Sequence, residues 1–324
     1  MVFDSHSDIW SDVTVKFMRG ETDIFRRYHY ERLREGGIEG SILAMWIDPP
    51  YDKTPALRLE QIMEAIEAET VCCQDLLRIV HDYGEMTAAR EEGLFYAFIG
   101  CEGLSGIGED IEKIDMLYEF GVRHASLTWN ERNALAAGAR AETDRGLTEL
   151  GIRALHKIQD RHMIFDVSHL NDKSFWDVMR HATGQVAATH SDSRRLCPAA
   201  RNLTDEMIKA VAETGGMIGV NAYPDFVSDK REEKTVDMLA GHIGHIADIA
   251  GIDHVGFGFD FCEFLEDEAS SSFCTDEESK VLYGLKDASE TPNILQAMQK
   301  IGFTKQDIRK VSYENWHRMI REIL

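Results

Sequence analysis

Five residues of metal-binding types stand at the ends of short apolar segments of the chain. They are His6, Asp8, Glu102, His169 and His190. Imidazole and carboxylate groups together suit zinc or a similar first-row divalent ion, and a carboxylate can bridge two such ions. Two ions about 3.5–4 Å apart form a hydrolytic centre. The residue types therefore predict a hydrolase that uses a pair of metal ions.

The spacing of these residues favours one shared site. His6 and Asp8 are separated by one residue at the end of a strand-like segment, so both side chains point to the same face. Glu102 ends another apolar segment, where a glutamate is rarely buried without a partner. Each residue alone has an ordinary structural explanation, such as a hydrogen-bonded histidine or a salt bridge. Five of them at strand ends favour the metal site.

Strand-like segments alternate with segments of helical periodicity along the chain. The predicted strands cover residues 2–6, 41–47, 94–100, 122–129, 163–168, 186–189, 217–222 and 255–259. The predicted helices cover residues 58–83, 111–120, 150–161, 173–181, 205–214 and 236–250, and the chain from residue 277 onward. Eight strands with intervening helices favour an α/β fold, the (β/α)8 or TIM barrel, with extra C-terminal helices. We expect residues 1–324 to form a single domain of this kind.

The active site of such a barrel lies at the C-terminal ends of its strands. Besides the five metal-binding residues, these ends carry Trp129, Tyr223 and Asp260. Long loops follow two of the strands, at residues 129–148 and 223–234. Loops on this face usually shape the substrate pocket, so we expect Trp129 and Tyr223 to contact the substrate.

Several other residues keep two interpretations. A carboxylate beside metal ions is a natural proton shuttle, but Asp260 could instead orient a ligand histidine. Arg201 follows His190 by 11 residues, and it could hold a substrate carboxylate or lie at the surface. His242 and His245 are expected at the surface of a helix. Cys262 is expected to pack rather than react.

Composition argues against several classes of partner. Lys and Arg together number 35 and Asp and Glu 57, which gives a net charge of −22. Nucleic acid and anionic membranes need a basic surface, so neither is an expected partner. We see no signal-peptide pattern and no apolar run near the roughly 18 residues of a membrane span. Six scattered cysteines do not indicate a disulfide framework, so reduced thiols and a cytoplasmic location are expected.

Six short motifs follow one another along the chain: DSHSD, CEG, LTWN, DVSH, THS followed by RN, and GFGFDF. In this order they resemble the renal dipeptidase (membrane dipeptidase, M19 peptidase) family of the amidohydrolase superfamily, over about residues 2–320. The resemblance implies a (β/α)8 barrel that hydrolyses dipeptides with two zinc ions, or with other divalent metals. It also implies that a D-residue can stand on the C-terminal side of the substrate, and it suggests a homodimer.

The resemblance assigns a role to each metal-binding residue. His6, Asp8 and Glu102 would bind one zinc ion. Glu102 would bridge to a second ion, which His169 and His190 complete. A hydroxide between the two ions would then attack the amide carbon of the dipeptide, and zinc would stabilise the oxyanion.

The resemblance also assigns the remaining site residues, with two departures. Asp260 matches the family's catalytic aspartate, which passes a proton to the leaving amine, and Arg201 matches its substrate-binding arginine. Trp129 stands where the best-known members have a histidine, and Cys262 replaces a second aspartate. Indole donates one hydrogen bond but carries no charge. Two alternatives therefore stay open: a hydrolase of another small amide or cyclic amide, and a non-catalytic metal-binding homologue.

Overall fold

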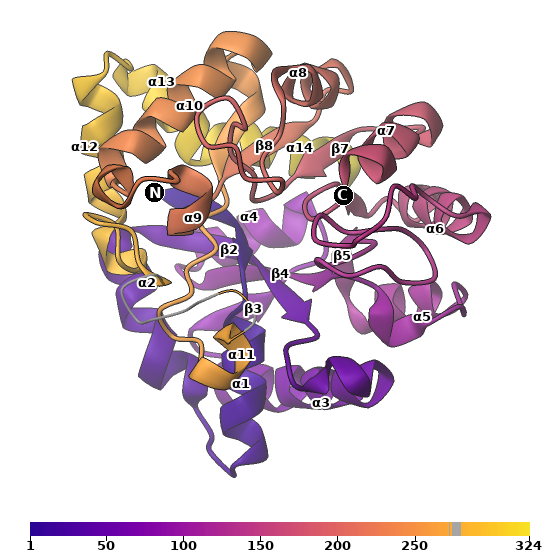
Figure 1. The fold of residues 1–324 in the computed structure, drawn as a ribbon. Coiled ribbons are helices and arrows are strands. Elements are labelled where there is room, and N and C mark those ends of the chain that lie inside the picture. Colours follow the sequence, from indigo (N-terminus) through magenta and orange to yellow (C-terminus); the bar gives the residue numbers. More distant parts are fainter. Residues whose placement is uncertain (272, 274–279) are drawn as a thin grey trace.

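Eight parallel strands form a closed barrel at the centre of the molecule (Figure 1). The computed structural model describes residues 1–271, 273 and 280–324. The barrel strands are β1 (Val2–Ser7), β2 (Ile38–Trp46), β4 (Phe95–Glu102), β5 (Val122–Ser126), β6 (Ile164–Asp166), β7 (Val186–Ala188), β8 (Met217–Val220) and β9 (Val255–Phe257). They are hydrogen-bonded in the order β2-β1-β9-β8-β7-β6-β5-β4, and pairing of β2 with β4 closes the ring. The predicted (β/α)8 barrel is confirmed.

Helices surround the strands on the outside of the barrel (Figure 1). They are α1 (Ile9–Met18), α2 (Glu31–Gly36), α3 (Pro55–Cys72), α4 (Tyr83–Glu91), α5 (Lys113–Phe120), α6 (Glu149–Asp160), α7 (Asp172–His181), α8 (Asp205–Glu213), α9 (Pro224–Val227), α10 (Val236–Ala250), α11 (Asp267–Ser270), α12 (Thr291–Lys300), α13 (Lys305–Arg309) and α14 (Asn315–Ile323). Helices α6, α7, α8 and α10 each begin after a polar side chain that accepts a backbone N–H; these side chains are Thr148, Asn171, Thr204 and Thr235. Such caps fix where a helix starts relative to the strand before it.

The predicted helix over residues 58–83 is wrong in its second half. Helix α3 ends at Cys72, and the chain turns so that the N–H of Leu77 bonds the carbonyl of Cys73 at 2.8 Å. A short strand, β3 (Leu77–Ile79), then pairs with β4 on the outside of the barrel, and α4 begins after Asp82. Strand β3 forms because it pairs with β4, which lies one helix further along the chain. Local periodicity does not reveal pairing of this kind.

The N-terminal end of the barrel is filled by the C-terminal helix. The ring of Trp316 on α14 lies 6.3 Å from that of Phe3 on β1. The hydroxyl of Tyr96 on β4 is 2.9 Å from Nε2 of His317. Because this end is plugged by side chains, the opposite end alone is available for a site, as in other barrels of this kind.

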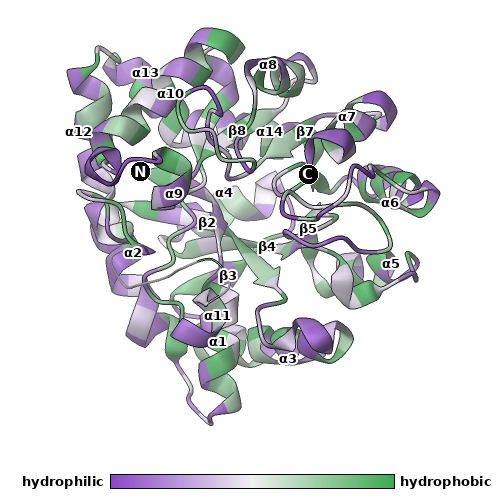
Figure 2. Cartoon of the chain, viewed as in Figure 1, coloured by the Kyte–Doolittle hydropathy of each residue, from purple (hydrophilic) through white to green (hydrophobic). Residues whose placement is uncertain are grey.

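The hydropathy of the chain follows this arrangement. The strands at the centre are largely apolar and the helices turn hydrophilic residues outward, as Figure 2 shows. Most residues of β2 and all of β4 are buried on both sides, which is typical of parallel strands covered by helices. In the part of the chain that the structure describes, no helix is both long and apolar enough to cross a membrane.

Two glycines let the backbone close up beneath the functional end. A Cβ at Gly219 or Gly258 would lie 2.0 or 1.7 Å from the carbonyl oxygen of Thr189. The hydroxyl of Ser5 also donates to that carbonyl, at 2.6 Å. Strands β1, β7, β8 and β9 therefore meet closely just below His190.

Candidate metal centre and substrate pocket

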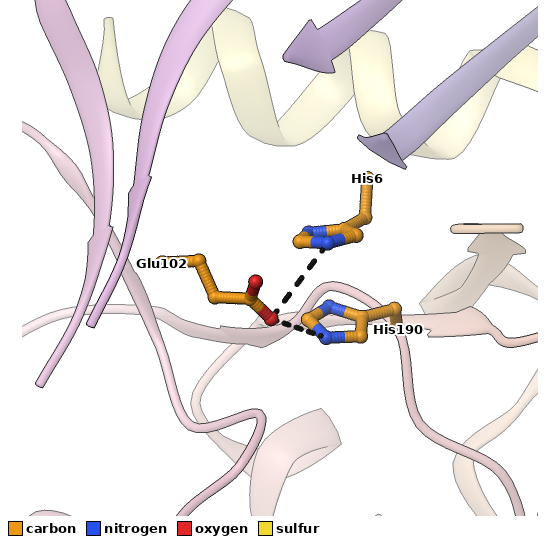
Figure 3. Close-up of side chains that lie close together, drawn as sticks. All are labelled: His6, Glu102 and His190. Atoms are coloured by element: carbon orange, nitrogen blue, oxygen red, sulfur yellow. Dashed lines mark ion pairs between the residues drawn. The ribbon is translucent and has the colours of Figure 1, made fainter. Parts of the chain in front are cut away.

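Three imidazoles converge on a single carboxylate oxygen. Oε1 of Glu102 lies 2.7 Å from Nε2 of His169, 3.2 Å from Nε2 of His190 and 3.8 Å from Nε2 of His6. Figure 3 shows the carboxylate of Glu102 pointing at the edges of the His6 and His190 rings, which are stacked with centroids 3.6 Å apart. The three histidines come from the ends of β1, β6 and β7, and Glu102 ends β4. His6 and His190 are 184 positions apart in the sequence, as are Ser5 and Thr189, which are joined by a hydrogen bond. The barrel thus brings distant parts of the chain together at this centre.

Two further carboxylates lie beside His6. Nε2 of His6 is 3.7 Å from Oδ1 of Asp8 and 3.7 Å from Oδ1 of Asp260. Within the described residues, both ring nitrogens of His6 and Oδ1 of Asp8 are buried without a hydrogen-bond partner. Buried polar atoms are rarely left unpaired in proteins, and a bound cation would satisfy Nε2 of His6 and Oδ1 of Asp8.

The two other histidines are also arranged as ligands. Nε2 of His169 lies 2.9 Å from Nε2 of His190, so both nitrogens face one another and the same oxygen of Glu102. Burial holds the pKa of both imidazoles well below the usual range, and the charges of His6 and Arg201 lower it further. Neutral imidazole is the form that binds a metal ion, so these rings are ready to act as ligands.

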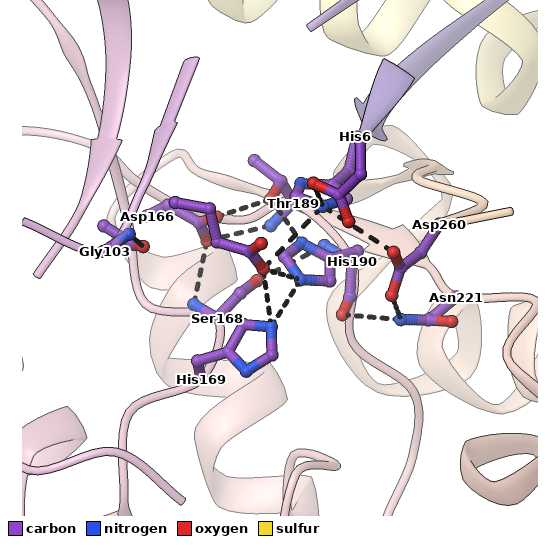
Figure 4. A network of polar contacts seen from close by, with 12 residues as sticks. His6, Gly103, Asp166, Ser168, His169, Thr189, His190, Asn221 and Asp260 are labelled. Atoms are coloured by element: carbon purple, nitrogen blue, oxygen red, sulfur yellow. Dashed lines mark hydrogen bonds and ion pairs between the residues drawn. The ribbon is translucent and has the colours of Figure 1, made fainter. Parts of the chain in front are cut away.

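Hydrogen bonds on the far side of each ring point its Nε2 toward the centre. Nδ1 of His169 lies 3.0 Å from Oδ1 of Asn130, an acceptor, so Nδ1 carries the proton. Nδ1 of His190 lies 2.8 Å from the hydroxyl oxygen of Thr189, which itself donates to Asp166 at 2.5 Å. Both tautomers leave the Nε2 lone pair free for a metal ion (Figure 4).

Asp166 anchors this support from inside the barrel. Its carboxylate accepts backbone N–H groups of Ser168 and Thr189 at 2.8 and 3.0 Å, and it lies 3.0 Å from Nε2 of His124. Burial alone would raise the pKa of this carboxyl, but the contacts with His124 and Thr189 outweigh burial and hold it well below its usual range. Asp166 is therefore a buried anion that fixes the loop carrying His169 and the hydroxyl behind His190.

The centre holds more negative charge than its own side chains balance. Burial and the nearby charge of Asp8 raise the pKa of Glu102 well above its usual range. Burial raises the pKa of Asp260 to about 6. Burial lowers the pKa of His6, but Glu102 and Asp8 outweigh it and raise the value to about 10. Clustered buried carboxylates are stabilised by divalent cations, so the donor set fits a metal centre.

Asp260 occupies the position expected for a proton-transfer residue. Its Oδ2 accepts a hydrogen bond from Nδ2 of Asn221 at 2.8 Å, and its side chain lines the pocket beside Asp8. The backbone at Asp260 is left-handed, with φ of 56°, and that at His169 is also left-handed, with φ of 68°. A positive φ is uncommon outside glycine, and two of the four non-glycine residues that adopt it among the described residues lie at this centre.

Arg201 is a buried residue and not the surface arginine that one interpretation allowed. Its side chain is 7% exposed. Its guanidinium donates to the hydroxyl of Ser191 and to the backbone carbonyl of His190, both at 2.8 Å. Arg201 does not belong to the residues that line the pocket, so it lies just beneath the site and contributes positive charge there.

A pocket opens above the centre. The predicted residues that line it are Asp8, Glu102, Trp129, His169, Tyr223 and Asp260. The remaining lining residues were not identified as site residues from the sequence; they are Trp46, Asn130, Arg140, Phe226, Cys262 and Phe273. Trp46 is the last residue but one of a predicted strand and Asn130 follows Trp129, so the position of both was a usable signal. His6 and His190 lie fully buried beneath the pocket floor.

One expectation about residues outside the centre needs correction. His242 is completely buried and not at the surface: Nδ1 accepts the N–H of Ser193 at 3.1 Å, and Nε2 donates to the carbonyl of Val227 at 2.8 Å. Cys262 is buried as expected, but it also lines the pocket. Among the described residues, Cys72, Cys73, Cys101 and Cys197 form no disulfide, and Cys274 lies outside the described residues.

The comparisons with known proteins agree on one family. The family model of the membrane dipeptidases (peptidase family M19) matches residues 1–324. An uncharacterised protein of the pqqA 5′ region of Klebsiella pneumoniae is 30% identical over 76% of this chain and 89% of its own length. Dipeptidase tcpJ of Claviceps purpurea is 24% identical over 97% of this chain and 65% of its own length.

Solved structures share the fold. A dipeptidase described as a metallopeptidase of family M19 superposes with a TM-score of 0.86 at 23% identity, covering 99% of this chain and 98% of that one. A metallopeptidase from Rhodobacter sphaeroides, bound to a phosphinate mimic of the dipeptide L-Ala-D-Ala, superposes with a TM-score of 0.86 at 22% identity, covering 100% and 99%. At these identities the structures establish the architecture.

Proposed function

Because the chain belongs to the membrane dipeptidase family (peptidase family M19), a family of metal-dependent hydrolases, we propose that it cleaves dipeptides at a centre of two zinc ions. The observation that carries this proposal is the convergence of three buried imidazoles on Oε1 of Glu102. Burial holds the pKa of two of these rings, His169 and His190, well below the usual range, so they are in the neutral form that binds metal.

The five residues divide into two overlapping ligand sets. His6 and Asp8 would hold one ion and His169 and His190 the other, with Glu102 shared between them. Zinc ions held by these residues would supply Lewis acidity toward the substrate carbonyl and would lower the pKa of a bound water. Other divalent ions with similar ligand preferences could replace zinc.

Asp260 would move the proton during the reaction. Its carboxylate faces the pocket, and the hydrogen bond from Asn221 fixes its orientation. From this place it can accept a proton from the attacking water and give it to the leaving amine nitrogen.

The substrate would be held from two sides. Arg201 supplies positive charge beneath the site, and this charge would attract a C-terminal carboxylate in the pocket. Trp129 and Tyr223 line the pocket above and would contact the substrate directly. We include dipeptides with a D-residue at the C-terminal side, because the Rhodobacter sphaeroides metallopeptidase was solved with a mimic of L-Ala-D-Ala.

Trp129 favours a second candidate on the same centre, a hydrolase of other small amides or cyclic amides. An indole cannot supply positive charge to a carbonyl oxygen, so the substrate contact at this position differs from one made by histidine. Recognition at this point therefore does not require the charged ends of a free dipeptide.

A substrate panel distinguishes these possibilities. Zinc-loaded protein would be given L-L and L-D dipeptides, N-acyl amino acids and lactams, and amine release would be measured for each. Turnover of dipeptides supports the proposal. Turnover of lactams or N-acyl amino acids alone would support the second candidate. Two bound ions with no turnover of any member would contradict both and indicate a non-catalytic homologue.

A further inference from the structure

Aromatic rings from four separate places in the chain form one side of the pocket. Trp46 ends β2, Trp129 follows β5, Tyr223 follows β8, and Phe273 comes from the segment after β9. The ring centroids lie 5.1 Å apart between Trp46 and Trp129, 6.3 Å between Trp129 and Phe273, and 5.7 Å between Tyr223 and Phe273. These distances are those of packed aromatic pairs, so the four rings form a continuous surface, the aromatic wall.

The aromatic wall stands directly beside the metal centre. Trp46 is the register partner of Glu102 in the parallel β2–β4 ladder, so their side chains point to the same side of the sheet. The ring of Trp129 lies 6.1 Å from that of His169. When the scissile carbonyl of a substrate lies at the centre, the neighbouring side chain of that substrate can therefore contact the aromatic wall.

The aromatic wall consists mostly of ring carbon atoms and is fixed in place. One of its polar atoms, Nε1 of Trp46, is buried without a hydrogen-bond partner among the described residues. Trp46 is 1% and Tyr223 3% exposed, so their rings are held by their surroundings. The hydroxyl of Tyr223 donates to the backbone carbonyl of Phe273 at 2.8 Å, which turns the polar end of this side chain away from a ligand. An apolar side chain gains free energy on such a surface, whereas a charged one loses its hydration.

Charge elsewhere in the pocket is limited. Among the described lining residues outside the centre, Arg140 is the basic one, and it is exposed to solvent. It therefore lies toward the mouth of the pocket. An acidic substrate side chain that lies on the aromatic wall would not pair with Arg140, whereas one directed toward the mouth of the pocket would.

We propose that the aromatic wall selects substrates in which the side chain next to the scissile amide is large and apolar, such as leucine or phenylalanine. This inference rests on the proposed function and names its substrate class. Trp129 is then a specificity-determining residue: it replaces a possible polar contact to the carbonyl by a surface for the neighbouring side chain.

The test compares kcat/KM for Leu-Leu, Phe-Phe, Gly-Gly and Ala-Asp in the zinc-loaded protein and in Trp129→Ala. The native protein should prefer Leu-Leu over Gly-Gly by about tenfold or more, since removing a few methylene groups from an apolar site costs on this scale. Trp129→Ala should lose most of that preference, chiefly through a higher KM for Leu-Leu. Trp129→Phe should restore it. Equal kcat/KM for Leu-Leu and Gly-Gly, or a preference for Ala-Asp, would overturn the inference, the latter in favour of Arg140.

A matched control and a binding measurement keep the two proposals apart. Trp176→Ala removes an indole from α7 that is 36% exposed, and it should leave the preference unchanged. Phosphinate mimics of Leu-Leu and Gly-Gly, measured by calorimetry, report on the aromatic wall even if no dipeptide is cleaved. Tighter binding of the Leu-Leu mimic without turnover would support the aromatic wall while contradicting the proposed function. Equal binding of both mimics would contradict the aromatic wall.

Discussion

At the scale of single residues, the centre depends on atoms that the protein itself leaves unpaired or faces toward one another. Nε2 of His6 and Oδ1 of Asp8 are buried without hydrogen-bond partners among the described residues. Nε2 of His169 and Nε2 of His190 are 2.9 Å apart, and they lie 2.7 and 3.2 Å from the same oxygen of Glu102. An arrangement of this kind is costly for an empty protein and becomes favourable once cations occupy it.

Asp260→Asn tests proton transfer without removing a metal ligand. The amide oxygen of asparagine can still accept the hydrogen bond from Asn221, but the side chain no longer accepts a proton from water. We expect kcat to fall by about 10²–10⁴ while the zinc content stays the same. Initial rates and elemental analysis on the same preparation check both parts. Turnover within twofold of the native protein would exclude Asp260 as the shuttle.

Thr189→Val tests the support behind His190. Valine has the same shape but cannot accept the proton of Nδ1, so the ring loses the contact that fixes its tautomer. Affinity for the ion held by His190 should drop about 10- to 100-fold in a chelator competition. Thr128→Val is the matched control, because the Thr128 hydroxyl is buried without a hydrogen-bond partner among the described residues. A Thr189→Val protein with native affinity would show that the hydroxyl has no such role.

At the scale of elements, the structure shows which features local sequence could reveal. The eight barrel strands were identified because they are buried on both sides and read as continuous apolar segments. Residues at the ends of such segments were placed correctly for the same reason. Strand β3 was missed because it has three residues and exists through pairing with β4. Phe273 and Arg140 were missed because loop conformation, not periodicity, brings them to the pocket.

His242 joins three elements and makes the stability of the protein depend on pH. It ties α10 to Ser193 after β7 and to Val227 at the end of α9. Burial lowers its pKa to about 4, below the 6.5 of an unfolded chain. Between these values the unfolded chain binds a proton that the folded protein excludes, so stability falls as the pH drops from about 6.5 to about 4.

The free energy of unfolding should fall by about 3 kcal/mol over that pH range, because a pKa difference of one unit corresponds to 1.36 kcal/mol. His242→Gln should be less stable at neutral pH. The amide of glutamine does not place its acceptor and donor where the imidazole does, so it cannot bond both the N–H of Ser193 and the carbonyl of Val227. Its unfolding free energy should nevertheless vary less between pH 6.5 and pH 4.5. Urea unfolding of metal-free native protein and variant at both pH values measures the difference. Parallel pH profiles would contradict this assignment.

At the scale of the whole molecule, one end of the barrel is a packed core and the other end carries the candidate site. The side chains of α14 fill the N-terminal end, and the metal centre with its pocket occupies the C-terminal end. The chain order alone predicted which end would carry the site, because parallel strands all end on the same side. It could not predict that the last helix would close the opposite end, since α14 comes from more than 300 residues after β1.

Trp316→Ala tests that closure. Trp316 is fully buried, and Cβ truncation would leave a cavity next to Phe3. We expect a loss of about 3–5 kcal/mol in unfolding free energy, which is typical of a large aromatic removed from a core. Trp176→Ala, on the exposed face of α7, should change stability by less than about 0.5 kcal/mol. If both variants unfolded at the same urea concentration, α14 would not be part of the core.

The central claim is that Glu102 is shared between two metal ions at the end of the barrel. The most direct measurement is the zinc content and dipeptide turnover of the native protein and of Glu102→Gln, each loaded with zinc and freed of excess by gel filtration. The native protein should hold about two zinc ions per chain and lose turnover on chelation, and zinc should restore it. Glu102→Gln should retain fewer ions and have no turnover. A native protein without tightly bound metal, or a variant that keeps both ions and full turnover, would contradict the account.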